Sequence, residues 1–169
     1  MKYLFVLLLV FSLPSTADSE WDQASISLEQ ETVITVYRSP DCQCCHKWIK
    51  HLETHHFKVL DEVTHNLAEI KDKVGMPTVM GSCHTALVDG YLIEGHVPAD
   101  DIKRLLLNKP EIKGLSVPQM PVGTPGMEMG EKKDRFTVIS FDEAGNYRIF
   151  NRYKVGPDKL YHSAVPTQP

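Results

Sequence analysis

Hydrophobic residues in the early part of the chain follow two different periods. Residues 32–37 (Thr-Val-Ile-Thr-Val-Tyr) and residues 57–63 are rich in β-branched and aromatic side chains, which favour strands. Between these runs, apolar residues recur three and four positions apart, which is the period of one helical face. The members of this face are Cys45, Trp48, Ile49 and Leu52. The pattern therefore predicts a strand, a helix and a second strand, in this order.

The following segment predicts two helices, one on either side of a hairpin. Asn66 precedes Glu69 by three residues, a spacing typical of a capping box at the start of a helix. Residues 85–93 contain a central Asp-Gly pair at positions 89–90, which favours a two-residue hairpin turn. Another helix is predicted after Pro98. The order β-α-β-α-β-β-α predicts an α/β fold of the thioredoxin-like class, with a central mixed sheet flanked by helices.

The last third of the chain has a different character. Residues 115–130 are rich in Pro, Gly and Met and predict a long ordered loop, a type of segment that often carries function. Residues 136–141 and 147–153 have the composition of two strands, which we expect to form a C-terminal β-hairpin. We therefore place one thioredoxin-like domain at residues 32–156 and a tail at residues 157–169.

The N-terminal segment has the features of a secretory signal. Residues 1–17 begin with the positive charge of Lys2 and continue with an apolar run over 3–13, which is too short to span a bilayer. The small residues at 15–17 fit a cleavage site. We expect a polar leader over 18–31 and, after cleavage, an exported chain without a stable membrane span. The alternative is a retained anchor or a buried N-terminal helix.

Composition and charge exclude one class of partner. The 169 residues carry 18 Lys and Arg against 22 Asp and Glu, which gives a formal net charge of −4. The basic residues are scattered among acidic ones and form no stripe with interleaved aromatics, so we expect no binding to nucleic acid. The length suits one domain with a substantial core.

Three of the four cysteines lie within four residues of one another. They are Cys42, Cys44 and Cys45, and the fourth is Cys83. In a thioredoxin-like domain, Cys42 and Cys45 would occupy the CxxC positions between the first strand and the following helix. Cys83 would precede the third strand, whose start lies beside the beginning of that helix. We therefore expect the fold to bring all four thiols together.

This cluster leaves several uses open. Cys42 and Cys45 can exchange disulfides with other proteins, because a helix N-terminus favours the thiolate. All four cysteines can instead form two structural disulfides, as exported proteins often do. Closely spaced thiolates also suit a soft cation, and Cu(I) accepts bridging sulfur more readily than zinc accepts a distorted tetrahedron. An iron–sulfur cluster normally has wider cysteine spacings. The extra thiol of Cys44 favours copper over simple disulfide exchange.

Histidines and methionines form a second group of candidate ligands. His46 and His84 each follow a cysteine directly, although regular strand alternation would point His84 away from Cys83. Met127 and Met129 form a Met-x-Met pair whose thioethers favour Cu(I). Ordinary packing or exposure is the alternative for each of these four residues. A further pair, His51 and His55, has the helical spacing of a surface metal site, but eight histidines make such a pair easy to obtain by chance.

Four segments resemble the CopG family, exported proteins that accompany bacterial copper-resistance systems and were long known as a domain of unknown function. They are residues 39–48 (Ser-Pro-Asp-Cys-Gln-Cys-Cys-His-Lys-Trp), 82–86, 90–98 and 114–130. The resemblance covers about residues 32–153. It implies a thioredoxin-like fold that carries copper on Cys42, Cys44, Cys45 and Cys83, with periplasmic copper handling as the function.

The resemblance also implies details of the chemistry. Copper would be the cofactor, held as Cu(I) and in a multi-copper cluster, and the protein would interconvert Cu(I) and Cu(II) as a copper oxidoreductase. Other periplasmic copper-resistance proteins would be its partners. A thiol–disulfide oxidoreductase that acts on exported proteins through Cys42 and Cys45 is the alternative function.

Overall fold

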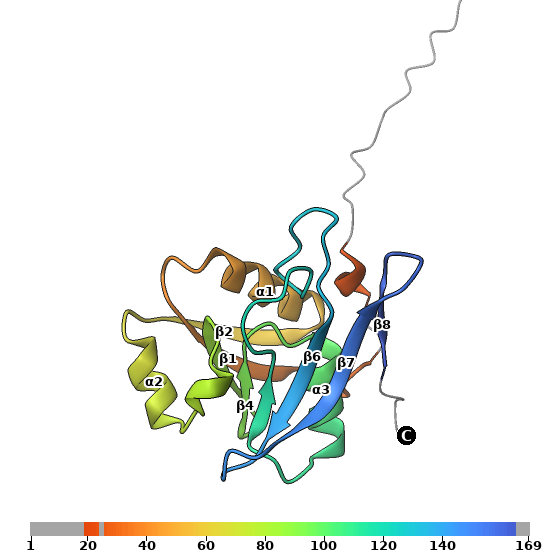
Figure 1. Cartoon of the computed structure of the whole chain (residues 1–169). Helices are drawn as coiled ribbons and strands as arrows, with labels where there is room; N and C mark the ends of the chain where they lie inside the picture. Colours follow the sequence, from red (N-terminus) through yellow and green to blue (C-terminus); the bar gives the residue numbers. More distant parts are fainter. Residues whose placement is uncertain (1–18, 24–25, 165–169) are drawn as a thin grey trace, which may run out of the picture.

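The computed structural model describes residues 19–23 and 26–164, so the signal expected at 1–17 lies outside the described residues (Figure 1). The α/β class is confirmed: the described part of the chain has three α-helices and one mixed sheet of eight strands. None of these helices has the length and apolar content needed to span a bilayer. The elements are η1 (Glu20–Asp22), β1 (Thr32–Arg38), α1 (Gln43–Thr54), β2 (Phe57–Val63), α2 (Leu67–Lys73), η2 (Thr78–Met80), β3 (His84–Val88), β4 (Tyr91–Glu94), α3 (Ala99–Asn108), β5 (Gly114–Ser116), β6 (Phe136–Phe141), β7 (Tyr147–Val155) and β8 (Tyr161–Ser163).

The sheet has the strand order β2-β1-β3-β4-β5-β6-β7-β8. β1 pairs in parallel with β2 and antiparallel with β3, and the register places Arg38 opposite His84. Parallel strands need a crossover, and α1 supplies it between β1 and β2. The predicted order of elements from the first strand to the third helix is therefore observed.

One face of the sheet carries the main core. Ile34 and Val36 alternate with more exposed neighbours along β1, as expected for a strand with one buried face. They pack in one cluster with Trp48 of α1 and Ile102 of α3. The predicted inner face of α1 is confirmed, since Cys45, Trp48 and Leu52 are fully buried. α1 and α3 thus cover the same side of the sheet.

A smaller core lies on the opposite face. Met76, Met80, Leu92 and Phe141 form a second buried cluster. Leu92 belongs to it while Ile93, its neighbour in β4, belongs to the main core, because successive side chains point to opposite faces. The segment that contains α2 and η2 therefore covers this second face and leads directly to Cys83.

The predicted hairpin and the predicted capping box have different outcomes. β3 and β4 are joined at Asp89 and Gly90, whose φ angles of 45° and 83° suit a two-residue hairpin turn. α2 begins after Asn66, as expected, but the side chain of Asn66 caps no backbone group and instead bonds to the carboxylate of Glu69. The capping box was therefore a wrong prediction, although the boundary of the helix was right.

Three short elements lie in segments expected to be loop or tail. β5 pairs with β4 and β6 at the start of the predicted loop, and a Cβ at Gly114 would lie 2.0 Å from the Leu92 carbonyl oxygen. β8 pairs with β7 within the predicted tail. Within the predicted leader, η1 carries Trp21, whose ring lies 5.1 Å from that of Tyr161. These elements form through tertiary contacts rather than through a local sequence pattern.

Candidate metal centre

The pairing of β1 with β3 brings Cys83 to the beginning of α1. Cys42 is the N-cap residue of α1, and Cys44 and Cys45 lie in its first turn. Cys83 directly precedes β3, whose first residue is paired with the last residue of β1. The Sγ atom of Cys44 lies 3.6 Å from that of Cys42 and 3.9 Å from that of Cys83. The sulfur atoms of all four cysteines lie within 4.8 Å of one another.

The four cysteines are not equivalent. Cys42 and Cys45 form a disulfide, while Cys44 and Cys83 are free. Cys42 and Cys44 are partly exposed and Cys45 is fully buried. The first turn of a helix also favours negative charge through its unpaired N–H groups and the helix dipole. The cluster therefore contains one disulfide-bonded pair and two free thiols next to it.

Two buried histidines face the sulfur of Cys83. Nδ1 of His84 lies 3.3 Å from this sulfur, and Nε2 of His96 lies 3.4 Å from it. On the far side of each ring, Nε2 of His84 donates to the Gly95 carbonyl at 2.9 Å and Nδ1 of His96 donates to the Pro125 carbonyl at 2.8 Å. A carbonyl oxygen only accepts, so these bonds fix the tautomers. Each neutral ring therefore turns an unprotonated nitrogen toward Cys83.

Burial controls the charge of this group. It lowers the pKa of His84 well below its usual value, with a smaller contribution from His96, and burial also lowers the pKa of His96. Burial raises the pKa of the Cys83 thiol to about 12, and the neighbouring Cys44 thiol adds to this rise. The histidines are therefore neutral at pH 7, and a cation that binds Cys83 must displace its proton.

The segment between β5 and β6 is fixed tightly over this group. Gly126 has a φ angle of +83°, and a Cβ there would lie 2.6 Å from the backbone nitrogen of Trp48 and 3.0 Å from the carbonyl oxygen of Cys44. Its neighbour Pro125 accepts the hydrogen bond from His96. The segment thus contacts both the helix that carries the CxCC residues and one of the two histidines.

Comparisons with known proteins agree with this arrangement. Residues 80–127 match the family model described as "Protein of unknown function, DUF411". A solved structure titled "Copper resistance protein copG- Form 2" is 43% identical, with a TM-score of 0.70, and the match covers 74% of this chain and 100% of that one. A second, "Copper resistance protein copG- Form 1", is 44% identical, with a TM-score of 0.69 and 73% and 98% coverage. The chain belongs to the CopG family. None of the curated proteins matches it in a sequence comparison.

This membership, together with the cysteine cluster, supports a copper-related function. The family assignment predicted from the four sequence segments is confirmed. The segment matched by the family model contains Cys83, His84 and His96, and it ends at Met127. The family model therefore covers Cys83 and the two histidines beside it, while Cys42, Cys44 and Cys45 precede the matched segment.

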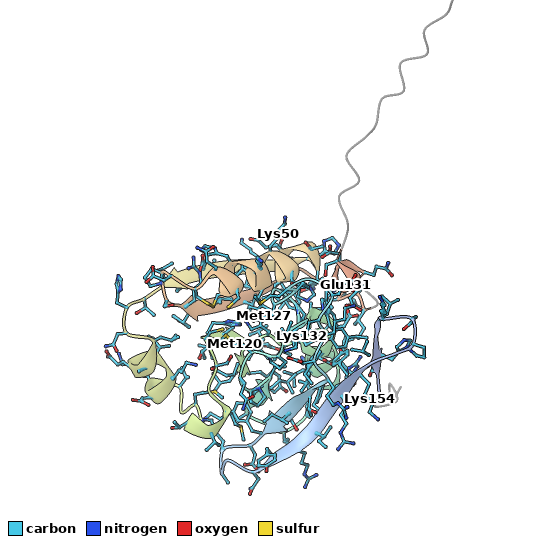
Figure 2. The ribbon with its side chains drawn as sticks, turned by 45° about the horizontal axis from the view of Figure 1, so that its top comes forward. Lys50, Met120, Met127, Glu131, Lys132 and Lys154 are labelled. Carbon is cyan, nitrogen blue, oxygen red and sulfur yellow. A yellow bond between two sulfur atoms is a disulfide. The ribbon has the colours of Figure 1, made fainter. Side chains whose placement is uncertain are left out.

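The other candidate ligands of this CopG chain lie in different surroundings. His46 is exposed on α1, Met129 is 64% exposed, and Met127 is partly buried. In the view of Figure 2, Met120 and Met127 lie below α1, and Lys50 projects from its upper side. His46, Met127 and Met129 remain predicted ligands.

His96 was missed at the level of sequence, whereas the spacing of His51 and His55 was correctly favoured as a chance one over a surface metal site. His96 follows Gly95 in an irregular segment, so no period indicated which way its ring points. His51 and His55 are buried, with ring centroids 4.4 Å apart, and do not form a surface site. The Ala99 N–H donates to Nε2 of His51, so the neutral ring carries its proton on Nδ1 and offers no free nitrogen.

Proposed function

We propose that this chain is a copper-binding protein of copper resistance that holds Cu(I) on Cys42, Cys44, Cys45 and Cys83. The observation that carries the proposal is the convergence of four sulfur atoms within 4.8 Å. His84 and His96 add two unprotonated nitrogens at Cys83. Thiolate sulfur is the donor that selects Cu(I), and imidazole nitrogen suits copper in both of its common oxidation states.

The donor set fits copper for an electrostatic reason as well. Several thiolates at this separation repel one another in a partly buried site, so they require a bound cation. Each histidine donates its far N–H to a backbone carbonyl, the arrangement that orients metal-binding imidazoles in proteins. Cu(I) tolerates low coordination numbers and allows one sulfur to bridge two ions, so this compact group can hold more than one copper ion.

The disulfide supports interconversion of Cu(I) and Cu(II). When the thiolates of Cys42 and Cys45 join, one S–S bond forms and two electrons are released, which reduce two Cu(II) ions to two Cu(I) ions. Reduction of the disulfide by a thiol donor returns the two ligands. Cys44 and Cys83 take no part in the disulfide, so these two thiols remain as copper ligands when the pair is oxidised.

We place this function in the periplasm. The signal predicted at residues 1–17 and the disulfide between Cys42 and Cys45 support an exported, oxidising location. Copper ions are the proposed ligand, and other copper-resistance proteins of the same compartment are the proposed partners. Fractionation of cells that express the full chain tests this location, and recovery in the cytoplasm would contradict it.

Anaerobic titration of the fully reduced protein with Cu(I) tests the binding function. We expect stoichiometric binding and the ultraviolet absorption of Cu(I)–thiolate bonds. The variant with all four cysteines changed to serine should lose both. If this variant binds as many Cu(I) ions as tightly as the wild type, the proposal is wrong.

Thiol–disulfide exchange is a second candidate function, and the Cys42–Cys45 disulfide at the start of α1 favours it. Cys42 is the partly exposed member of the pair, so it is the one that a substrate thiol can reach. In Cys45→Ser, Cys42 should remain joined to substrate proteins as mixed disulfides, detectable on non-reducing gels. Cells that yield no such adducts would argue against this function.

A further inference from the structure

The fully buried carboxylate of Glu94 bonds to the residues on either side of the Cys83–His84 pair. Glu94 ends β4 and has no exposed surface. One of its oxygens accepts a hydrogen bond from the Ser82 N–H at 2.5 Å and an ion-paired bond from the Lys71 ammonium. Its other oxygen accepts from the Thr85 hydroxyl at 2.5 Å. Both oxygens are therefore bonded, and all three donors lie outside the set of proposed ligands.

These contacts enclose the short segment that carries Cys83 and His84. Glu94 holds the backbone N–H of Ser82, the residue before Cys83, and the side chain of Thr85, the residue after His84. Lys71 also donates to the Ser82 carbonyl at 2.7 Å. The Glu94–Lys71 pair therefore holds both backbone polar groups of Ser82. Neither side chain of the pair contacts a cysteine sulfur in these bonds.

Stability alone does not account for this arrangement. Removing a carboxylate and an ammonium from water costs several kcal/mol for each ion, and a buried pair often contributes no more than an apolar pair of the same size would. Such pairs do fix geometry, because each bond has a narrow range of length and direction. Metal sites need this control, since their donor atoms must be held in place by a surrounding shell of bonds.

We propose that Glu94, together with Lys71, is a positioning residue for the metal centre. It fixes Ser82 and Thr85 so that the sulfur of Cys83 and Nδ1 of His84 converge with the thiols of α1. This role rests on the proposed copper function. It predicts that the pair is needed for the geometry and the affinity of copper binding, and not only for folding.

Three substitutions test the role from different sides. Glu94→Gln removes the charge and one acceptor, Lys71→Gln removes the bond to the Ser82 carbonyl, and Thr85→Val removes a single hydroxyl. Asp101→Asn is the matched control. Asp101 is equally buried and accepts bonds from Asn151 and Tyr153 in a separate network between α3 and β7.

The reduced full-length proteins are compared in three measurements: Cu(I) affinity by competition with a chromophoric chelator, the luminescence spectrum of bound Cu(I), and amide hydrogen exchange of residues 82–85 without metal. We expect Glu94→Gln and Lys71→Gln to weaken Cu(I) binding about tenfold, as losses around metal ligands typically do. The spectrum should change, and exchange at residues 82–85 should become faster. Asp101→Asn should lower the melting temperature and leave all three readouts unchanged.

The outcomes separate this inference from the proposed function. Failure of the wild type to bind Cu(I) would overturn the proposed function. Wild-type binding with unchanged affinity, spectrum and exchange in the Glu94 and Lys71 variants would overturn only the positioning role, whatever their melting temperatures. If Glu94→Gln does not fold, Lys71→Gln and Thr85→Val decide the question by the same readouts.

Discussion

At the scale of single residues, the orientation of two imidazoles defines what the site can bind. His96 has its Nδ1 proton committed to the Pro125 carbonyl, so Nε2 is the nitrogen that faces Cys83 at 3.4 Å. His84 shows the mirror arrangement, with the opposite ring nitrogen turned to the same sulfur. Regular strand alternation would have pointed His84 away from Cys83, but its ring lies against this sulfur. The ring reaches the sulfur because His84 is the first residue of β3, where regular alternation has only begun.

Replacement of His96 by leucine should weaken Cu(I) binding about tenfold, because one nitrogen donor is lost while the volume of the ring is largely kept. Competition with a chromophoric Cu(I) chelator measures the effect. His65→Leu is the control, since His65 is exposed and lies outside the set of predicted ligands. Equal affinities for wild type and His96→Leu would remove His96 from the ligand set.

His51 makes stability depend on pH. Burial, and then the neighbouring His55, lower the pKa of His51 to about 3, whereas an unfolded chain keeps a pKa near its ordinary value of 6.5. Between these values the unfolded state binds the extra proton, so the free energy of unfolding falls as the pH is lowered. The loss from this residue is about 2 kcal/mol at pH 5.

His51→Gln keeps an acceptor for the Ala99 N–H and cannot titrate in this range. We expect its melting temperature to fall less between pH 7 and pH 5 than that of the wild type. The exposed His65→Gln should behave as the wild type does. A steeper or equal fall in His51→Gln would contradict the assignment of a buried neutral imidazole.

At the scale of elements, the segment between β5 and β6 packs closely against the backbone of α1 at Gly126. The sequence indicated an ordered loop there, because Pro, Gly and Met recur, but nothing in it indicated the partner. The contact of Gly126 with the backbone of Cys44 and Trp48 joins residues that are far apart in the chain. Such a contact has no local period, so a pattern of hydrophobic positions cannot reveal it.

Gly126→Ala should therefore destabilise the protein by about 3 kcal/mol, through left-handed strain and a clash with the helix backbone. Gly130→Ala is the matched control in the same loop, since Gly130 has a φ angle of +69° and nothing within 4 Å of an added Cβ. It should lose only about 1 kcal/mol from strain. Urea unfolding measures both. Equal losses would show that the contact with α1 contributes nothing.

At the scale of the whole molecule, ordered structure continues past the predicted domain on both sides: η1 precedes residue 32, and the sheet gains β8 after residue 156. The elements between β1 and α3 were predictable, because each has its own period, turn or breaker. β5, β8 and η1 were not, because short segments gain their structure only from neighbours. The same distinction holds for the site. The four cysteines were found through their spacing, whereas His96 and the Glu94–Lys71 pair required the fold.

Trp21, near the N-terminal end of the described residues, packs against the last two strands of the sheet. Its ring contacts Tyr153 and Tyr161, and its Nε1 donates to the Gly123 carbonyl at 2.8 Å. Trp21→Ala should lower the free energy of unfolding by about 2 kcal/mol, less than for a fully buried tryptophan. Tyr147→Ala, at an aromatic residue that is 67% exposed, should change it by less than about 0.5 kcal/mol. Urea denaturation distinguishes the two, and a Trp21 effect no larger than that of Tyr147 would contradict the packing.

The proposed donor atoms come from three parts of the chain: the start of α1, the start of β3 and the segment after β4 that carries His96. Unfolding keeps Cys42, Cys44 and Cys45 near one another but separates them from Cys83, His84 and His96, so the native state should bind the ion more tightly than the unfolded chain does. On the proposed function, copper would then stabilise the native state: at a free concentration 1,000 times the dissociation constant it would add at most about 4 kcal/mol to the free energy of unfolding. The reverse also holds. A cell that supplies little copper keeps this protein closer to its unfolding threshold, and proteolysis would remove unused copies first.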